Sequence, residues 1–162
     1  MVSAVSCRRT PEVCVITRRM TKADYEELAE FRYALRQFQR ASEQRAIKAG
    51  LTIQQYLALL AIKGFSGRDH VTVGELAERL LIHHHSAVGL VDRLVSNELV
   101  MRQPAIEDRR QVYVILTSRG AEVLETIACQ NRAQLRDLRP VMNTLLETLA
   151  NESAAISASP EL

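Results

Sequence analysis

The helical pattern of this 162-residue chain breaks off near residue 96 and gives way to two strand-like segments. Residues 99–103 and 112–116 have the composition of strands, and the second is rich in β-branched side chains. Residues 104–111 connect them and are more numerous than the roughly two to five residues usual in a hairpin loop. Helical segments lie on both sides. This order predicts a mainly α fold with a small β-hairpin.

Capping signals show where the N-terminal helices begin. In each, a threonine is followed three residues later by a side chain that accepts a hydrogen bond from its backbone N–H. The three pairs are Thr21 and Asp24, Thr52 and Gln55, and Thr72 and Glu75. The first opens a long helix that ends near Gly50, and the other two open short amphipathic helices. A further amphipathic segment runs from about residue 85 to Ser96, after a tight turn over residues 82–84.

The C-terminal part is predicted to be helical again. Thr117 caps a long helix, and Pro140 stands where a separate last helix can start. We therefore expect a weakly ordered arm over 1–20, one domain over 21–150 and a frayed tail over 151–162. Within the domain, 21–50 and 118–150 are outer helices, and 52–116 are a compact lobe.

Composition excludes several classes of protein. Hydrophobic residues make up 47% and charged residues 25%, which are ordinary values for a globular domain. No apolar run is long enough to span a membrane, and the N-terminus lacks the features of a signal peptide, so a cytoplasmic location is expected. Net charge is +2. Over residues 70–120 six basic and six acidic side chains cancel, so only the placement of the arginines can favour an anionic partner.

Two short helices followed by a hairpin with a basic loop make a winged helix-turn-helix. The second helix suits the major groove of duplex DNA, and its N-terminus attracts phosphates. The candidate DNA-binding residues are His84, His85 and Ser86 at that N-terminus, Arg93 further along the helix, and Arg109 and Arg110 in the wing. Asp108 is expected to orient a wing arginine.

These segments resemble the MarR family of bacterial transcription regulators. The most specific match is Asp108-Arg109-Arg110 followed by Leu116-Thr117-Ser118-Arg119-Gly120, similar to the family's D-x-R wing motif and L-T-x-x-G junction. Residues 73–80 and 86–94 match the two helices of the motif, and residues 51–56 match the preceding segment. The resemblance covers about residues 25–150.

The resemblance implies a homodimer held by the first and last helices, bound to a pseudopalindromic operator. It implies that Arg110 reaches the minor groove with Asp108 as its orienting carboxylate. Members usually repress, and release DNA when a small phenolic, acyl thioester or oxidant is sensed in a cleft between the outer helices and the DNA-binding lobe. We expect a ligand-responsive repressor with double-stranded DNA, a second copy and a small-molecule effector as partners, and no membrane partner.

Two departures from the family stand out. Glu98 occupies a position where many members have glycine, so Asn97 is expected to take the left-handed cap. Relatives that sense peroxides place a cysteine inside the first helix, at a position that falls near Phe31 here. Cys14 lies too far upstream to match it.

Competing interpretations remain for several residues. Histidines 83–85 are adjacent and cannot share one helix face, so no metal and no cofactor are expected. No phosphate loop, nucleophile elbow or catalytic triad is recognisable, so the chain is expected not to be an enzyme. Cys129 is expected to pack within a helix. A thiol-based sensor using Cys14, or a winged helix that binds protein without specific DNA binding, are the alternative functions.

Aromatic residues are candidates for an effector pocket, although a stripe at helical spacing is more often core. The four are Tyr25, Tyr33, Phe38 and Tyr56.

Overall fold

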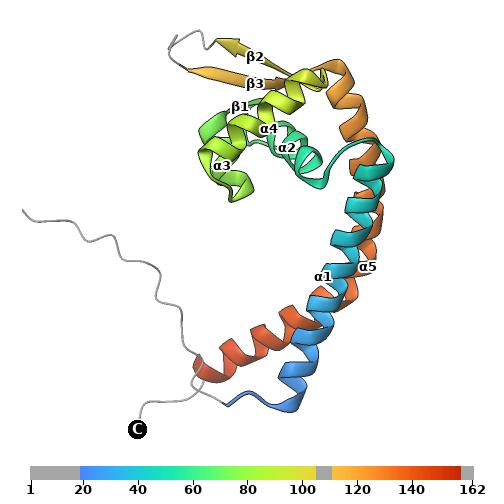
Figure 1. The fold of residues 1–162 in the computed structure, drawn as a ribbon. Coiled ribbons are helices and arrows are strands. Elements are labelled where there is room, and N and C mark those ends of the chain that lie inside the picture. The colour runs from blue at the N-terminus through green and yellow to red at the C-terminus, as the bar shows by residue number, and fades with distance from the viewer. Residues whose placement is uncertain (1–18, 105–110, 158–162) are drawn as a thin grey trace, which may run out of the picture.

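A computed structural model of the chain describes residues 19–104 and 111–157, with side chains described to residue 151. The elements in chain order are α1 (Lys22–Lys48), α2 (Ile53–Lys63), β1 (His70–Thr72), α3 (Val73–Leu80), α4 (His84–Ser96), β2 (Val100–Pro104), β3 (Val112–Leu116) and α5 (Ser118–Ser157). Figure 1 shows α2, α3, α4 and the three strands gathered in a lobe at one end of the molecule. Helices α1 and α5 lie side by side and extend away from this lobe. The mainly α fold with a small hairpin is confirmed.

Capping boxes begin the first three helices as predicted. The side chains of Thr21, Thr52 and Thr72 each accept a hydrogen bond from the backbone N–H three residues on. The side chain at that third position accepts one in return from the threonine N–H, which satisfies two donors that the first turn cannot pair. These local signals therefore place the start of α1, α2 and α3.

The sheet has three antiparallel strands in the order β1-β3-β2. In its register Val71 lies opposite Val114, and Met101 lies opposite Ile115. The β2–β3 hairpin confirms the predicted wing strands. Strand β1 was not expected, because residues 64–70 read as a loop. Three residues are too short to show the alternation that identifies a strand from sequence.

The apolar core joins the lobe to the long helices. Helix α4 buries Ala87, Leu90, Val91 and Leu94, which share one face at helical spacing. Leu90, Val91 and Leu94 pack in one cluster with side chains of α2, α3 and the sheet, among them Leu59, Ile62, Leu76, Val71 and Val114. The same cluster includes Ala46 of α1 and Leu124 and Ile127 of α5. The lobe is therefore seated on α1 and α5 through shared buried side chains.

The junction between β3 and α5 packs directly against the backbone that follows α4. A Cβ atom built on Gly120 would lie 1.9 Å from the carbonyl oxygen of Leu99, far inside van der Waals contact. Thr117 completes the junction, because its N–H donates to the Leu99 carbonyl (3.1 Å) and its hydroxyl donates to that of Glu98 (2.6 Å). The same hydroxyl accepts from the Gly120 N–H at 3.0 Å. The threonine and glycine of the junction motif thus have distinct structural roles.

The expectation of a separate last helix at Pro140 is wrong. Helix α5 continues from Ser118 to Ser157 with Pro140 inside it. Proline lacks an N–H and crowds the preceding turn, so it bends a helix more readily than it ends one when apolar residues continue on the same face. Figure 1 shows α5 changing direction in its C-terminal part, where the Thr148 hydroxyl still donates to Glu27 of α1 at 3.1 Å. Within the described residues, no helix is long and apolar enough to cross a bilayer.

The left-handed residue after α4 is Glu98 (φ 59°), so the expectation that Asn97 takes this conformation is wrong. Asn97 has φ −90° and keeps its N–H bonded to the Arg93 carbonyl. The N–H groups of Glu98 and Leu99 then donate to the carbonyls of Val95 and Leu94, the two-bond pattern of a Schellman motif. The residue that follows the C-cap in this motif must be left-handed, and here that residue is Glu98. Asparagine tolerates the left-handed conformation better than glutamate does, but Asn97 is one position too early.

Gly120→Ala should lower the free energy of unfolding by about 3 kcal/mol or more, because the new methyl group meets fixed backbone. The matched control is Gly74→Ala in α3, where the nearest atom to the added Cβ lies 3.9 Å away. That variant should be unchanged or up to about 1 kcal/mol more stable, since alanine favours a helix. Urea unfolding measures both, and equal stability of the two variants would contradict the close contact.

Candidate nucleic-acid interface

Helix α4 presents a polar face to solvent at its N-terminal turn. His84, His85 and Ser86 are the first three residues of the helix, and all are exposed. The next residue, Ala87, begins the buried face. The first turn therefore projects three polar side chains while the same helix is held in the core, which is the arrangement a recognition helix needs.

The turn before α4 is tight and strained. Leu81 adopts a left-handed conformation (φ 54°, ψ 43°) and is 92% exposed. The N–H of Ile82 donates to the Ala77 carbonyl across the end of α3. A leucine in this conformation costs about 1 kcal/mol or more relative to glycine. The turn reverses the chain within three residues and connects α3 to α4 as a helix-turn-helix.

Free backbone donors are available at the start of α4. His83 is the N-cap residue, and its side chain forms no capping hydrogen bond. The rings of His83 and His85 instead stack, with centroids 5.5 Å apart. The N–H groups of His84 and His85 therefore remain open to an anion, and the helix dipole favours one, whereas the Ser86 N–H donates to the His83 carbonyl at 3.0 Å. Among residues 19–104 and 111–157, no three histidine, cysteine or acidic side chains gather as metal ligands.

An ion pair links strand β2 to helix α4. Arg102 of β2 lies 2.7 Å from Asp92 of α4, and both side chains are partly exposed. Asp92 thus pairs with a wing residue, and its chain neighbour Arg93 lies exposed in the last turns of the helix. Such a pair adds at most about 1 kcal/mol to stability, beside the buried contacts of Val100 in β2 and Leu94 in α4 within the core cluster.

The predicted wing residues Asp108, Arg109 and Arg110 lie outside the described residues. Their flanks are described, because β2 ends at Pro104 and β3 begins at Val112. Figure 1 shows these two strands extending past the helices of the lobe. Pro104 and Val112, which flank this segment, are the last paired positions of the hairpin.

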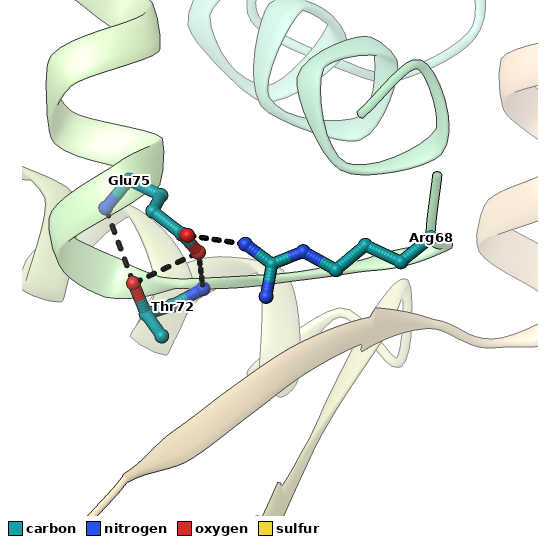
Figure 2. A network of polar contacts seen from close by, with 3 residues as sticks. All are labelled: Arg68, Thr72 and Glu75. Carbon is teal, nitrogen blue, oxygen red and sulfur yellow. Dashed lines mark hydrogen bonds and ion pairs between the residues drawn. The ribbon is translucent and has the colours of Figure 1, made fainter. Parts of the chain in front are cut away.

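A polar cluster supports the start of α3 (Figure 2). The Glu75 carboxylate accepts from the N–H of Thr72 at 2.8 Å and from its hydroxyl at 3.0 Å, and it forms an ion pair with Arg68. Arg68 also lies over the ring of Phe65, 4.5 Å from its centroid. Partial burial raises the pKa of Glu75, but hydrogen bonds from Thr72 and the charge of Arg68 outweigh it and leave the pKa below 4.5.

The aromatic residues proposed for an effector pocket are not gathered in one place. Tyr25 and Tyr33 are each 59% exposed on α1, and Phe38 is half-buried further along the same helix. Tyr56 is only 3% exposed, and its hydroxyl is hydrogen-bonded within the protein. Cys129 was expected to be packed, but it is exposed on α5.

Sequence reasoning missed two features that organise this region. The Asp92–Arg102 pair joins residues ten apart that belong to different elements, and no local pattern marks it. Asn131 of α5 is buried and hydrogen-bonded to residues of α1 and α2. A single polar residue interrupting the apolar positions Leu124, Ile127 and Leu138 was the available signal for this second feature.

Comparisons with known proteins agree with this architecture. The sequence profile of the MarR family matches residues 49–111. The organic hydroperoxide resistance transcriptional regulator of Bacillus subtilis is 30% identical over 112 residues, which are 63% of this chain and 74% of the relative. The chain belongs to the MarR family. It is therefore a transcription regulator of a DNA-binding family, and its lobe is the family's winged helix-turn-helix.

Solved MarR-family structures share the fold. AbsC of Streptomyces coelicolor, a MarR family transcriptional regulator, superposes with a TM-score of 0.64 at 20% identity, covering 88% of this chain and all of that one. A MepR mutant of Staphylococcus aureus bound to an oligodeoxyribonucleotide gives a TM-score of 0.58 at 19% identity, with 86% and 99% covered. The chain also matches 49 to 54% of the length of three further transcriptional regulators, among them the activatory protein BadR of Rhodopseudomonas palustris and the repressor NicR of Pseudomonas putida.

Glu75→Gln should destabilise the protein at neutral pH by up to about 1 kcal/mol, because glutamine keeps the cap but loses the ion pair with Arg68. The folded-state pKa of Glu75 is lowered, so its charge stabilises the fold above pH 4.5, the ordinary value, and this contribution disappears as pH falls through the folded-state pKa. The stability difference between wild type and variant should therefore shrink below pH 4.5. Urea unfolding across pH 3 to 7 (roughly the range that brackets the ordinary carboxyl pKa) tests this.

The control is Glu78→Gln on the exposed side of the same helix. The free energy of unfolding of this variant should differ little from that of the wild type at every pH measured. A Glu75→Gln difference that does not change with pH would contradict the role of the carboxylate charge.

Proposed function

We propose that this chain acts as a homodimer that represses transcription by binding a pseudopalindromic operator and releases it when a small effector binds. The two α4 helices enter successive major grooves, and the wings reach the flanking minor grooves. His84, His85 and Ser86 meet bases and phosphates at the start of α4. Arg93, Arg109 and Arg110 supply positive charge further along and at the wing, where Asp108 orients Arg110.

The exposed first turn of α4 is the observation that carries this proposal. Three polar side chains and unpaired backbone donors lie together there, on a helix whose opposite face is fixed in the core. The hairpin is joined to the same helix by the Asp92–Arg102 pair and by Val100 and Leu94 in the shared core. A helix end and a hairpin fixed to one another in this way fit two adjacent grooves of one duplex.

Exposed apolar side chains on α5 support the dimer. Leu135, Met142 and Leu149 recur every seven residues in the part of α5 beyond the lobe, and each is almost half exposed. Leu146 lies beside them and is 58% exposed. Four large apolar side chains along one helix are more than a monomer normally leaves in water, and a second copy would cover them.

The effector is proposed to be a small molecule, on the strength of the family resemblance. The B. subtilis relative is named for organic hydroperoxide resistance. The position that carries the peroxide-sensing cysteine in such relatives falls near Phe31, which is half-buried on α1. We therefore propose that the effector acts without a cysteine at that position. Cys14 lies outside the described residues, and no observation favours it as a sensor.

Replacing the proposed DNA-contacting arginines should weaken operator binding. Arg110→Ala and Arg93→Ala should each cost about 1–3 kcal/mol if the side chain reads a base, and less if it meets only phosphate. A mobility-shift titration on the chain's own upstream DNA, at two salt concentrations and with competitor duplex, measures this. Wild-type affinity should fall steeply with salt because phosphate contacts release counterions.

Arg40→Ala is the control, because Arg40 is exposed on α1, outside the DNA-binding lobe. Its affinity should equal that of the wild type. If Arg110→Ala also binds like the wild type, the proposed wing contact is wrong. Equal, weak binding of the wild type to every duplex would favour a winged helix that binds protein.

A further inference from the structure

Asn131 lies where three helices meet and is only 5% exposed. Its side-chain amide donates one hydrogen bond to the hydroxyl of Ser42 on α1 (2.9 Å) and another to the hydroxyl of Tyr56 on α2 (2.8 Å). Its carbonyl oxygen accepts from Arg45 on α1 at 2.7 Å. One buried side chain of α5 is therefore bonded to both α1 and the first helix of the lobe.

Asn131 lies on the packed face of α5, so its hydrogen bonds restrict how the neighbouring helices can be placed. On α5 it follows buried Leu124 and Ile127 and precedes buried Leu138 at heptad spacing, so it replaces an apolar residue on the packed face of the helix. A buried amide is tolerated only when its donors and acceptor are bonded, and here both donors and the oxygen are. Apolar neighbours can slide over one another, whereas this arrangement fits one relative position.

Tyr56 connects the junction to the DNA-binding lobe. The residue is 3% exposed, and the residues that follow it in α2 include Ala58, Leu59 and Ile62 of the lobe core. A rotation of the lobe on α1 and α5 would separate the Tyr56 hydroxyl from Asn131. The hydrogen bond between them therefore opposes such a rotation.

We propose that Asn131 and Tyr56 are positioning residues that set the angle between the lobe and the long helices, and with it the spacing of the two recognition helices. The inference rests on the proposed homodimer, because only a dimer reads two half-sites. In such a dimer the long helices form the common frame, and a small rotation of each lobe changes the distance between the two α4 helices. Half-sites about one helical turn apart then fit only one lobe angle.

The test measures operator affinity as a function of half-site spacing. The probes are the tightest duplex that the full-length wild type selects from a random-sequence pool, derivatives with one base pair added or removed between the half-sites, and a single half-site. Tyr56→Phe should lower affinity for the optimal spacing about fivefold, the effect of losing a hydrogen bond of typical strength. Adding a base pair between the half-sites should lower the affinity of this variant less than it lowers that of the wild type. The affinity of the variant for a single half-site should equal that of the wild type.

Ser42→Ala is the matched control. It removes a partner of the same amide group but leaves the bond to Tyr56, so its spacing profile should follow the wild type. Asn131→Leu should flatten the profile as Tyr56→Phe does. Asn131→Asp should restore it, because both hydroxyls can turn to donate to the carboxylate while Arg45 still donates.

A uniform loss of affinity in Tyr56→Phe, with the spacing profile of the wild type, would overturn the inference and leave Tyr56 with a packing role. The same holds if Ser42→Ala flattens the profile equally. A wild type that is monomeric, or that binds the half-site as tightly as the full operator, would overturn the homodimer itself and this inference with it. Urea unfolding of each variant accompanies the binding measurements.

Discussion

The backbone contact between Gly120 and Leu99 brings three parts of the molecule to one point. Leu99 follows the turn that ends α4 and precedes β2, while Gly120 lies in the first turn of α5. Thr117 bonds across the same gap to the carbonyls of Glu98 and Leu99. The recognition helix, the wing and the long helix therefore meet with no side chain between their backbones. Any larger residue at 120 would force them apart.

Three polar side chains form contacts between elements around the apolar core. The Glu75 carboxylate supports the start of α3, Asp92 holds Arg102 of the wing, and Asn131 joins the lobe to α1 and α5. The first two are partly exposed and contribute little to stability. Each adds a polar contact to an element that the core already holds through a buried side chain, Leu76 in α3 and Val100 in β2. The effector response proposed above would act through such positions, because an effector can shift the lobe only between definite arrangements.

Local chemistry explains which parts of the fold were predictable. The capping threonines specify helix starts through bonds three residues away, so Thr21, Thr52 and Thr72 could be identified without knowing the fold. The hairpin followed from β-branched composition, and the spacing of Thr117 and Gly120 matched the junction motif. Strand β1 was missed because it is defined by its partner β3 and not by its own sequence.

The other features that the sequence did not predict depend on contacts between residues far apart in the chain. Proline at the start of a helix and proline inside one share the same local signal, and only the packing that continues past Pro140 separates them. By contrast, His84, His85 and Ser86 were expected at the N-terminus of α4, and they are its first three residues. Partners of Asn131 lie 75 and 89 residues away, so a buried asparagine was visible in the sequence only as an interruption of an apolar pattern.

The lobe and the long helices share one buried core, which limits where the chain can be cut to make a fragment or a chimera. Leu124 and Ile127 of α5 and Ala46 of α1 belong to the same buried cluster as the helices that hold α4. A fragment cut at the end of β3 would expose one side of that cluster and lose the Gly120 contact as well. A chimera that moves this DNA specificity to another scaffold therefore has to cross over inside α5, beyond Ile127, and carry the end of α1 with it. The smallest transferable part is therefore the lobe together with the end of α1 and the start of α5.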